Sequence, residues 1–230
     1  MLAVFVNAAA VILGSLVGIL LHNKLKPHHT KTVVACMGIC AMVIGVTEAI
    51  ATSNIIIVIV CLVAGTVIGE LVKLEQRLDG AGDWLKARVA QKHSGRFTEG
   101  FVTASLLFCV GSMSIIGSFD AGLRGDYNII FAKSVMDCIM SITFAATMGI
   151  GVAFSALTIL VYQGALTLLA GVIEPVLTQP MITEMSAVGG VMLIATGINV
   201  AALAKERIRV GNMLPGLIFP VIWFAIAGLF

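Results

Sequence analysis

Residues 128–173, NIIFAKSVMDCIMSITFAATMGIGVAFSALTILVYQGALTLLAGVI, set the architecture of the whole chain. Lys133 and Asp137 are the only charged residues in this stretch. One helix of this length would be about twice as long as a bilayer core is thick, because a helix rises about 1.5 Å per residue and the core measures about 30 Å. Met148-Gly149-Ile150-Gly151 near the middle favours a turn, since glycine adopts the backbone angles of tight turns. The stretch therefore predicts a hairpin of two transmembrane helices.

Apolar stretches of similar length lie on both sides of this hairpin. A helix needs about 20 apolar residues to cross a bilayer, where its backbone polar groups find no water. Six further stretches meet this requirement: 2–21, 33–51, 54–72, about 97–119, about 183–204 and 211–230. With the hairpin they predict a single membrane domain over residues 1–230, an all-α polytopic transmembrane helical bundle of about eight spans.

The composition excludes a soluble globular protein. Hydrophobic residues make up 59% of the chain and charged residues only 11%, whereas a soluble domain has about 25% charged residues to cover its surface. The outside of the molecule therefore faces lipid, and the bilayer is its first expected partner. The five cysteines lie in apolar stretches without the spacing of a zinc site. We expect no metal, no cofactor and no nucleic-acid partner.

The lysine and arginine residues test the number of spans independently, because cytoplasmic loops carry an excess of them. With the N-terminus outside, eight spans place nearly all of them on the inner side: Lys24, Lys26, Lys31, Lys73, Arg77, Lys86, Arg88, Lys92, Arg96, Lys205, Arg207 and Arg209. Arg124 falls in an outer loop, and Lys133 lies within a span. Seven spans would leave the last three of the list outside. We therefore predict eight spans with both termini on the outer side.

The basic inner-side loop at about 73–96 predicts an interfacial helix along the membrane surface. Asp83 is a favourable N-cap for the sequence Trp84-Leu85-Lys86-Ala87-Arg88-Val89, which alternates apolar and basic residues. This helix either contacts anionic lipid or is a solvated basic linker. Trp84 favours the lipid contact, because tryptophan is typical of the headgroup level.

Two glycine pairs raise the hypothesis of an internal repeat. Gly38 and Gly45 in the second span have the same spacing as Gly190 and Gly197 in the seventh. These spans cross in opposite directions, so related halves would form inverted repeats, which many transporters use for alternating access. Glycine is common in this chain, and the pattern alone leaves the repeat open.

Ionisable side chains inside a bilayer are energetically expensive, so each needs a partner or a function. Lys133 and Asp137 are four residues apart and therefore neighbours on one helix face. They form either a stabilising ion pair or a binding site in which an ion or solute competes for one of them. Glu48 lies in the second span, and Lys133 from another span is a candidate partner for it.

Residues 111–118, GSMSIIGS, combine glycines with small hydroxyl residues in the fourth span. Such a sequence either packs closely against a neighbouring helix or breaks the helix. A broken helix is tolerated in a bilayer only where it lines protein or a wet cavity. Ser112 and Ser114 are therefore candidate binding residues, and Asn7 and Asn199 are further uncharged candidates in the first and seventh spans.

Two small-xxx-small motifs predict close helix contacts. Gly14 and Gly18 lie in the first span, and Gly65 and Gly69 in the third. The commoner arrangement has such motifs pack against each other within one chain. A bundle of this size can also pair about a twofold axis, and we expect a homodimer. Glu70 follows Gly69, where it either takes part in this contact or simply reaches the inner membrane surface.

Two classes of function fit these features. A secondary transporter or channel for a small ion or metabolite accounts for the intramembrane charges, the broken-helix candidate and the inverted repeat. A membrane scaffold or accessory subunit would use the charges only to hold helices together. A transporter should contain a polar cavity that reaches Lys133, Asp137 or Glu48, whereas a scaffold should pack them dry. We expect no enzyme activity, since no nucleophile–base pair or catalytic metal motif is present.

The chain resembles a family of bacterial inner-membrane proteins of unknown function, the YqgA/YdfK type (domain of unknown function 554). The resemblance covers essentially the whole chain, and its elements are specific only in combination. They are Asn7 with Gly14 and Gly18, Gly69-Glu70, Leu107-Phe108-Cys109 leading to Gly117, Gly125-Asp126, Lys133-Ser134 with Asp137, Ser186-Ala187-Val188-Gly189-Gly190, and Asn212-Met213-Leu214-Pro215. The resemblance implies a bacterial inner-membrane location and no particular substrate.

Overall fold

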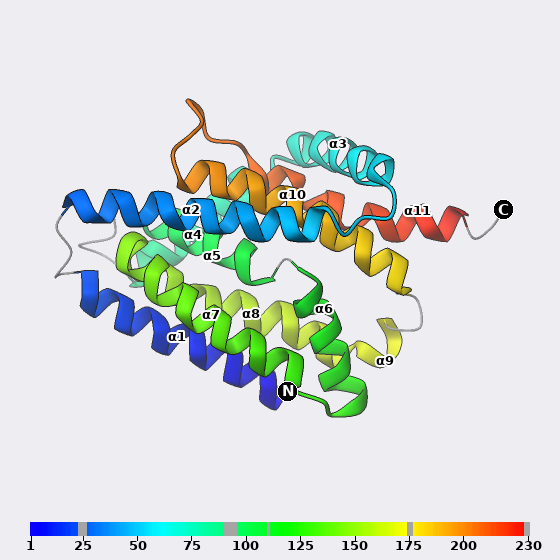
Figure 1. Cartoon of the computed structure of the whole chain (residues 1–230), viewed down its shortest axis with the longest axis horizontal. Coiled ribbons are helices and arrows are strands. Elements are labelled where there is room, and N and C mark those ends of the chain that lie inside the picture. The colour runs from blue at the N-terminus through cyan, green and yellow to red at the C-terminus, as the bar shows by residue number, and fades with distance from the viewer. Residues whose placement is uncertain (23–26, 90–95, 110, 174–176, 228–230) are drawn as a thin grey trace.

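The computed structural model describes residues 1–22, 27–89, 96–109, 111–173 and 177–227, and every regular element in these ranges is helical (Figure 1). The longer helices are α1 (Leu2–His22), α2 (Pro27–Ala49), α3 (Ile55–Val72), α4 (Leu74–Val89), α5 (Phe97–Cys109), α7 (Asn128–Met148), α8 (Gly151–Leu168) and α10 (Gln179–Val200). The shorter ones are α6 (Ser112–Phe119), the π-helix η1 (Asp120–Arg124), α9 (Ala170–Ile173), the 3₁₀-helix η2 (Val210–Leu217) and α11 (Phe219–Ala227). The predicted all-α membrane bundle is confirmed.

The number of spans is close to the prediction but lower. In the described ranges six helices are long and apolar enough to cross a membrane, and α5 with α6 makes a seventh if the bent pair is one span. The predicted eighth span, 211–230, differs, because its apolar helix Val210–Ile226 is shorter than the others. Its first part is the 3₁₀-helix η2, where Pro215 has no N–H to donate to an α-helical bond.

The hairpin predicted from residues 128–173 is confirmed. α7 ends at Met148 and α8 begins at Gly151. Between them Gly149 has a φ of 82°, a backbone conformation that favours glycine. The turn therefore lies at the position that the sequence indicates.

The two small-xxx-small motifs make close helix contacts, but with other partners than each other. A Cβ on Gly14 or Gly18 of α1 would overlap the backbone of α7 at Cys138 and Ile142. A Cβ on Gly65 or Gly69 of α3 would overlap η2 instead. The expectation that the motifs pack against each other is therefore wrong, because each lies against a helix from the second half of the chain.

The glycines of α2 and α10 form a reciprocal contact that we call the glycine seam. A Cβ on Gly38 would lie 2.6 Å from the carbonyl oxygen of Gly197, and one on Gly197 would lie 2.5 Å from that of Gly38. Gly45 and Gly190 have the same relation, at 2.5 Å in both directions. The helices are thus antiparallel and touch through their main chains, which is the pattern that a twofold axis of an inverted repeat would produce.

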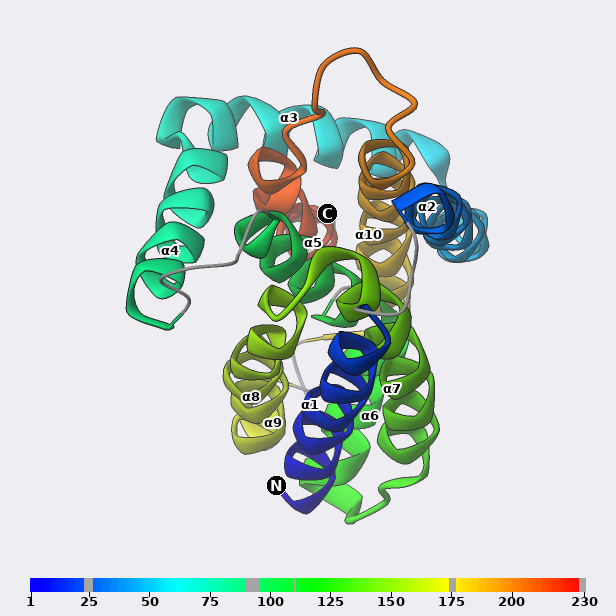
Figure 2. The ribbon, with the colours of Figure 1, turned by 90° about the vertical axis from the view of Figure 1, so that its left-hand side faces the viewer.

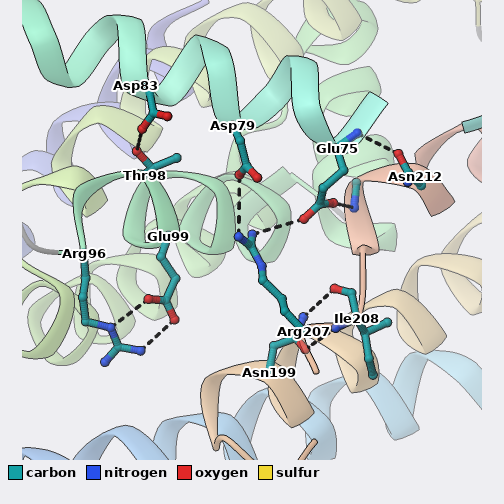
Figure 3. Close-up of polar contacts among 11 residues, drawn as sticks. Glu75, Asp79, Asp83, Arg96, Thr98, Glu99, Asn199, Arg207, Ile208 and Asn212 are labelled. Carbon is teal, nitrogen blue, oxygen red and sulfur yellow. Dashed lines mark hydrogen bonds and ion pairs between the residues drawn. The ribbon is translucent and has the colours of Figure 1, made fainter. Parts of the chain in front are cut away.

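One end of the bundle, which we call the basic end, carries α4 and residues 201–209. Arg207 forms ion pairs with Glu75 at 3.2 Å and Asp79 at 3.7 Å, both on α4 (Figure 3). Arg209 contacts Glu70 at the end of α3, at 3.2 Å. These contacts bring the basic segments after the third and seventh predicted spans to the same end, as the predicted topology requires.

Helix α4 lies at the edge of the bundle, beside α5 (Figure 2). It begins at Leu74 rather than after Asp83, so the predicted N-cap is wrong. Asp83 lies inside the helix and accepts a hydrogen bond from the Thr98 hydroxyl at 2.6 Å. Trp84 is 59% exposed, and the Arg88 guanidinium carbon lies 4.7 Å from the centre of its ring. An exposed tryptophan beside an arginine suits the headgroup region.

Candidate functional site

The centre of the candidate site is an ion pair on α7. Lys133 Nζ contacts Asp137 Oδ2, and the residues are only 6% and 4% exposed. Their i, i+4 spacing places both on the helix face that packs into the bundle. Lys133 Nζ also lies 5.9 Å from the centre of the Phe108 ring. The predicted pair is therefore formed and buried.

Two amides from other helices extend this pair into a polar network. Asn7 Nδ2 on α1 donates to Asp137 Oδ2 at 3.2 Å and to Gln163 Oε1 on α8 at 3.1 Å. Asn7 and Gln163 are both 0% exposed. Asn7 Oδ1 and Gln163 Nε2 have no hydrogen-bond partner among the described residues. A buried acceptor and a buried donor without partners are unusual.

Of the two alternatives that the sequence left open for the fourth span, the structure has the break, and it lies beside the ion pair. α5 ends at Cys109, α6 begins at Ser112, and the two segments are bent by 59°. Gly111 has a φ of 130° and a ψ of 153°, a region that is essentially restricted to glycine. The Ser114 hydroxyl donates to the carbonyl oxygen of Phe108 at 3.0 Å, so it satisfies one of the acceptors that the break exposes.

A cavity of about 60 Å³ lies at this break, between α2, α5 and α7. Its walls include Glu48, Gly111, Ser114, Lys133 and Asp137. A water molecule occupies about 30 Å³ in the liquid, so the space suits one or two waters or a small ion. The cavity reaches the intramembrane charges that the sequence singled out, but most of its lining is apolar, so it does not by itself distinguish a transporter from a scaffold.

Several candidates from the sequence lie away from this cavity. The amide of Asn199 exchanges two hydrogen bonds of 2.8 Å with the backbone of Ile208, and so fixes the chain at the basic end (Figure 3). Glu70 reaches the surface, where it contacts Arg209 with about half of its side chain exposed. The side chain of Ser112 lies outside the described residues.

Glu184 has a structural role that its position in the sequence does not indicate. It is 1% exposed and accepts hydrogen bonds from the Thr52 hydroxyl at 2.5 Å and from the backbone N–H groups of Ser53 and Asn54 at 2.8 and 3.3 Å. It therefore fixes the loop before α3. Because α10 begins at Gln179, four residues before the predicted start of the span, Glu184 lies within the helix rather than at its margin.

Two larger cavities lie near opposite ends of α10. The one at the basic end measures about 340 Å³ and is lined by Glu75, Arg96, Glu99, Asn199 and Arg207, among others. The one at the other end measures about 400 Å³, and its walls include Asp120, Arg124 and Gln179. Asn199 and Gln179 are separated by 20 residues of helix, roughly 30 Å. The molecule thus has one cavity with charged walls near each end of α10, in addition to the smaller cavity at the break.

Glu75 has a perturbed environment at the basic end. Its Oε2 accepts a hydrogen bond of 2.5 Å from the N–H of Gly211, and its own N–H donates to Asn212 Oδ1 at 2.7 Å. Burial raises the pKa of this carboxyl above its ordinary value, although the Gly211 N–H and Arg207 oppose the shift. In the described part of the chain, no group of three or more His, Cys, Asp or Glu side chains has metal-binding geometry.

Comparisons with known proteins agree on one family. Residues 2–225 match the family model described as "Protein of unknown function (DUF554)". The "Uncharacterized membrane protein YdfK" of Bacillus subtilis is 32% identical over 219 residues, which cover 93% of this chain and 91% of that protein. The "Uncharacterized protein YqgA" of Escherichia coli K12 is 31% identical over 234 residues, with 96% and 98% covered. No solved structure matches.

The match to the family model and the two relatives covers nearly the whole chain, including the ion pair, the break and the basic end. The chain is thus a membrane protein that belongs to the DUF554 family.

Proposed function

We propose that this protein moves a small ion or small polar solute across the membrane, and that the cavity at the α5–α6 break is its binding site. The observation that carries the proposal is that Glu48, Lys133 and Asp137 line one cavity at a broken helix. Discontinuous helices near the bilayer midplane are where many transporters bind their substrates. The proposal includes no catalytic step.

The chemistry of the cavity favours a charged or strongly polar occupant. Lys133 and Asp137 hold each other at the wall, so an anion that enters competes with Asp137 for Lys133, and a cation competes with Lys133 for Asp137. The N-terminus of α6 begins at this wall, and the dipole of a helix favours negative charge at that end. Asn7 of α1 donates hydrogen bonds to both Asp137 and Gln163 of α8, so an occupant that displaces Asp137 would also alter the contacts of α1 and α8.

The larger cavities near the two ends of α10 support access from both sides. The glycine seam supports relative movement of the two halves, because it is a reciprocal contact between two antiparallel helices, one from each half. Alternating access between inverted repeats needs both features.

We further propose that the protein lies in the bacterial inner membrane with both termini outside. The two relatives come from bacteria, and the ion pairs collect basic segments from distant parts of the chain at one end. Cytoplasmic loops are the ones enriched in lysine and arginine.

The alternative function, a membrane scaffold or accessory subunit, is favoured by one observation. Lys133 and Asp137 are in direct contact, and a pair that serves only to hold helices together would look the same. Hydration of the cavity separates the two functions, since a scaffold needs no path from water to Ser114.

Thiol labelling tests this difference. Ser114→Cys, in a chain whose native cysteines are replaced by alanine, should react with a small water-soluble thiol reagent in proteoliposomes. Ser141→Cys is the matched control, because Ser141 is equally buried but lies where α7 meets Gly14 of α1. Reaction at 114 and not at 141 is the expected result. If both sites stay unreactive, the cavity has no aqueous access and the transport proposal fails.

The substrate is found by uptake measurements. Proteoliposomes with the wild-type protein are screened with labelled inorganic ions, amino acids and organic acids, with the double variant Lys133→Met, Asp137→Asn as the matched control. The proposal predicts at least one solute whose uptake falls about tenfold or more in the double variant. Equal uptake by the two proteins for every solute would contradict it.

A further inference from the structure

Two adjoining cavities lie between α4, α5 and η2, at and below the basic end. The first is the charged cavity of about 340 Å³ described above. The second measures about 190 Å³, and its walls are largely apolar: Leu78, Phe101, Tyr162, Leu214 and Leu217 are among its residues. Val102 and Leu106 of α5 line both. We call the two together the α4–α5 cleft.

The two compartments follow each other along the span. On η2, Val210 and Gly211 line the charged compartment, and Leu214 and Leu217 line the apolar one. On α5 the charged compartment begins at Arg96 before the helix, whereas the apolar compartment extends to Cys109 at its last residue. The cleft is therefore charged at the membrane surface and apolar toward the bilayer interior.

The charged compartment presents two guanidinium groups. Arg96 donates to both carboxylate oxygens of Glu99 at 2.8 and 2.7 Å, and Arg207 pairs with Glu75 and Asp79 (Figure 3). A guanidinium has five N–H donors, and the two hydrogen bonds of Arg96 to Glu99 occupy two of them, whereas Arg207 makes ion pairs of 3.2 and 3.7 Å. Arginine is the side chain best suited to phosphate, because its planar fork matches the phosphate oxygens.

Both signs of charge line these walls, and Asp79, outside them, also pairs with Arg207. Arg96 and Arg207 contribute two positive charges, and Glu75 and Glu99 contribute two negative ones. Such a wall complements a headgroup that contains both a phosphate and an ammonium group. The arginines would hold the phosphate, and the carboxylates would face the ammonium.

The apolar compartment is open enough to admit a chain. Leu78, Phe101, Tyr162, Leu214 and Leu217 are all partly exposed rather than buried. In a bilayer such a partly exposed apolar channel meets acyl chains. Trp84 and Arg88 on the neighbouring surface of α4 place this helix at headgroup depth.

We propose that the α4–α5 cleft binds one phospholipid of the phosphatidylethanolamine class from the leaflet at the basic end, with its phosphate at Arg96 and Arg207 and one acyl chain beside Leu214 and Leu217. The proposal does not depend on transport, because the cavity at the α5–α6 break is not part of it; the charged compartment is the basic-end cavity named above as an access route, which a bound lipid would narrow. A lipid bound in this cleft would link α4, α5 and η2, because its headgroup would touch all three.

Native mass spectrometry of the full chain tests the proposal. Delipidated protein is titrated with dioleoyl-phosphatidylethanolamine, and the wild type should bind one molecule more tightly than any other. Arg96→Gln and Arg207→Lys should each weaken this binding about tenfold or more, the first because it removes a charge and the second because an ammonium lacks the planar fork of a guanidinium. Arg207→Lys keeps a positive charge beside Glu75 and so protects the fold. Arg88→Gln is the matched control, since it removes the same charge from the same surface outside the cleft.

Two further measurements separate lipid from soluble ligands. Leu214→Trp fills the apolar compartment and should weaken lipid binding with the arginines in place, while a melting temperature near that of the wild type verifies its fold. O-phosphoethanolamine, which has the headgroup and no chains, should not compete at millimolar concentration. If it competes as well as the lipid, the site belongs to a soluble phosphate compound and the proposal is wrong. Equal lipid binding by wild type, Arg96→Gln and Arg207→Lys would also overturn it.

Discussion

Asp137 accepts contacts from two directions, from Lys133 on its own helix and from Asn7 on α1. The sequence predicted the first contact, because i, i+4 spacing is a local property of a helix. It could not predict the second, because Asn7 is 130 residues away and only the packing of α1 on α7 brings it near. Asn7 was a candidate as a polar residue in a span, and the structure supplies its partner.

Removing one member of the ion pair should leave a buried charge without its partner. Lys133→Met or Asp137→Asn alone is expected to destabilise the protein by about 3–5 kcal/mol. The double variant removes both charges and should recover most of this stability. Thermal melting of the three variants in detergent measures the effect. Single variants that melt with the wild type would show that the two residues do not stabilise each other.

The pH dependence of stability should reveal the environment of Glu75. Its pKa is raised in the folded protein by burial, so the folded state holds the proton more tightly than the unfolded state. Its contribution is therefore fully present below the unfolded pKa and is lost as pH rises through the raised folded value. The melting temperature of the wild type, relative to that of Glu75→Gln, should increase as pH falls through this window. A difference that is constant or has the opposite trend would contradict this.

At the scale of elements, some helix boundaries are determined by residues at the boundary itself and others by contacts with distant segments. The turn at Gly149 was predicted and the break at Gly111 was one of two alternatives, because a glycine with a positive φ lies at both positions. The start of α4 was not predictable, since it depends on a contact between distant segments. Asn212 caps α4 at Glu75, and the two are 137 residues apart.

The glycine seam should be intolerant of even one methyl group. A Cβ on Gly190 would lie 2.5 Å from the carbonyl oxygen of Gly45 and 2.6 Å from the N of Ala49. Gly190→Ala must therefore push main chains apart, at a cost of about 1–3 kcal/mol. Gly164→Ala on α8 is the matched control, because its Cβ would meet only Met1 Cε, at 3.6 Å. It should be neutral or stabilise by up to about 1 kcal/mol. Similar melting temperatures for the two variants would refute the close contact.

At the scale of the whole molecule, the predicted topology places the basic end on the inner side of the membrane, and thiol labelling can test this orientation. Glu206→Cys is exposed between Lys205 and Arg207, and Ser53→Cys is exposed in the loop that Glu184 holds at the other end. In intact cells of a strain that expresses each variant without other cysteines, an impermeant thiol reagent should label position 53 and not position 206. Labelling of 206 from outside would reverse the predicted orientation.

The homodimer remains a prediction with less support than the sequence suggested. Gly14 and Gly18 lie against α7, and Gly65 and Gly69 lie against η2. These four glycines are therefore used within the chain and do not form an interface for a second copy. The sequence identified residues suited to close contact, but their partners depend on the packing of the whole bundle.

The long separation between contact partners has a consequence for biosynthesis. Asn7 and the glycine faces of α1 and α2 emerge from the ribosome long before α7 and α10, and Asp137 is made 130 residues after Asn7. At about 5–20 residues per second this is a delay of roughly 7 to 26 s. During that interval an unsatisfied amide and two exposed glycine faces lie in the membrane without their native neighbours. The insertion machinery therefore has to shield these groups of the nascent chain until the second half of the chain has been synthesised.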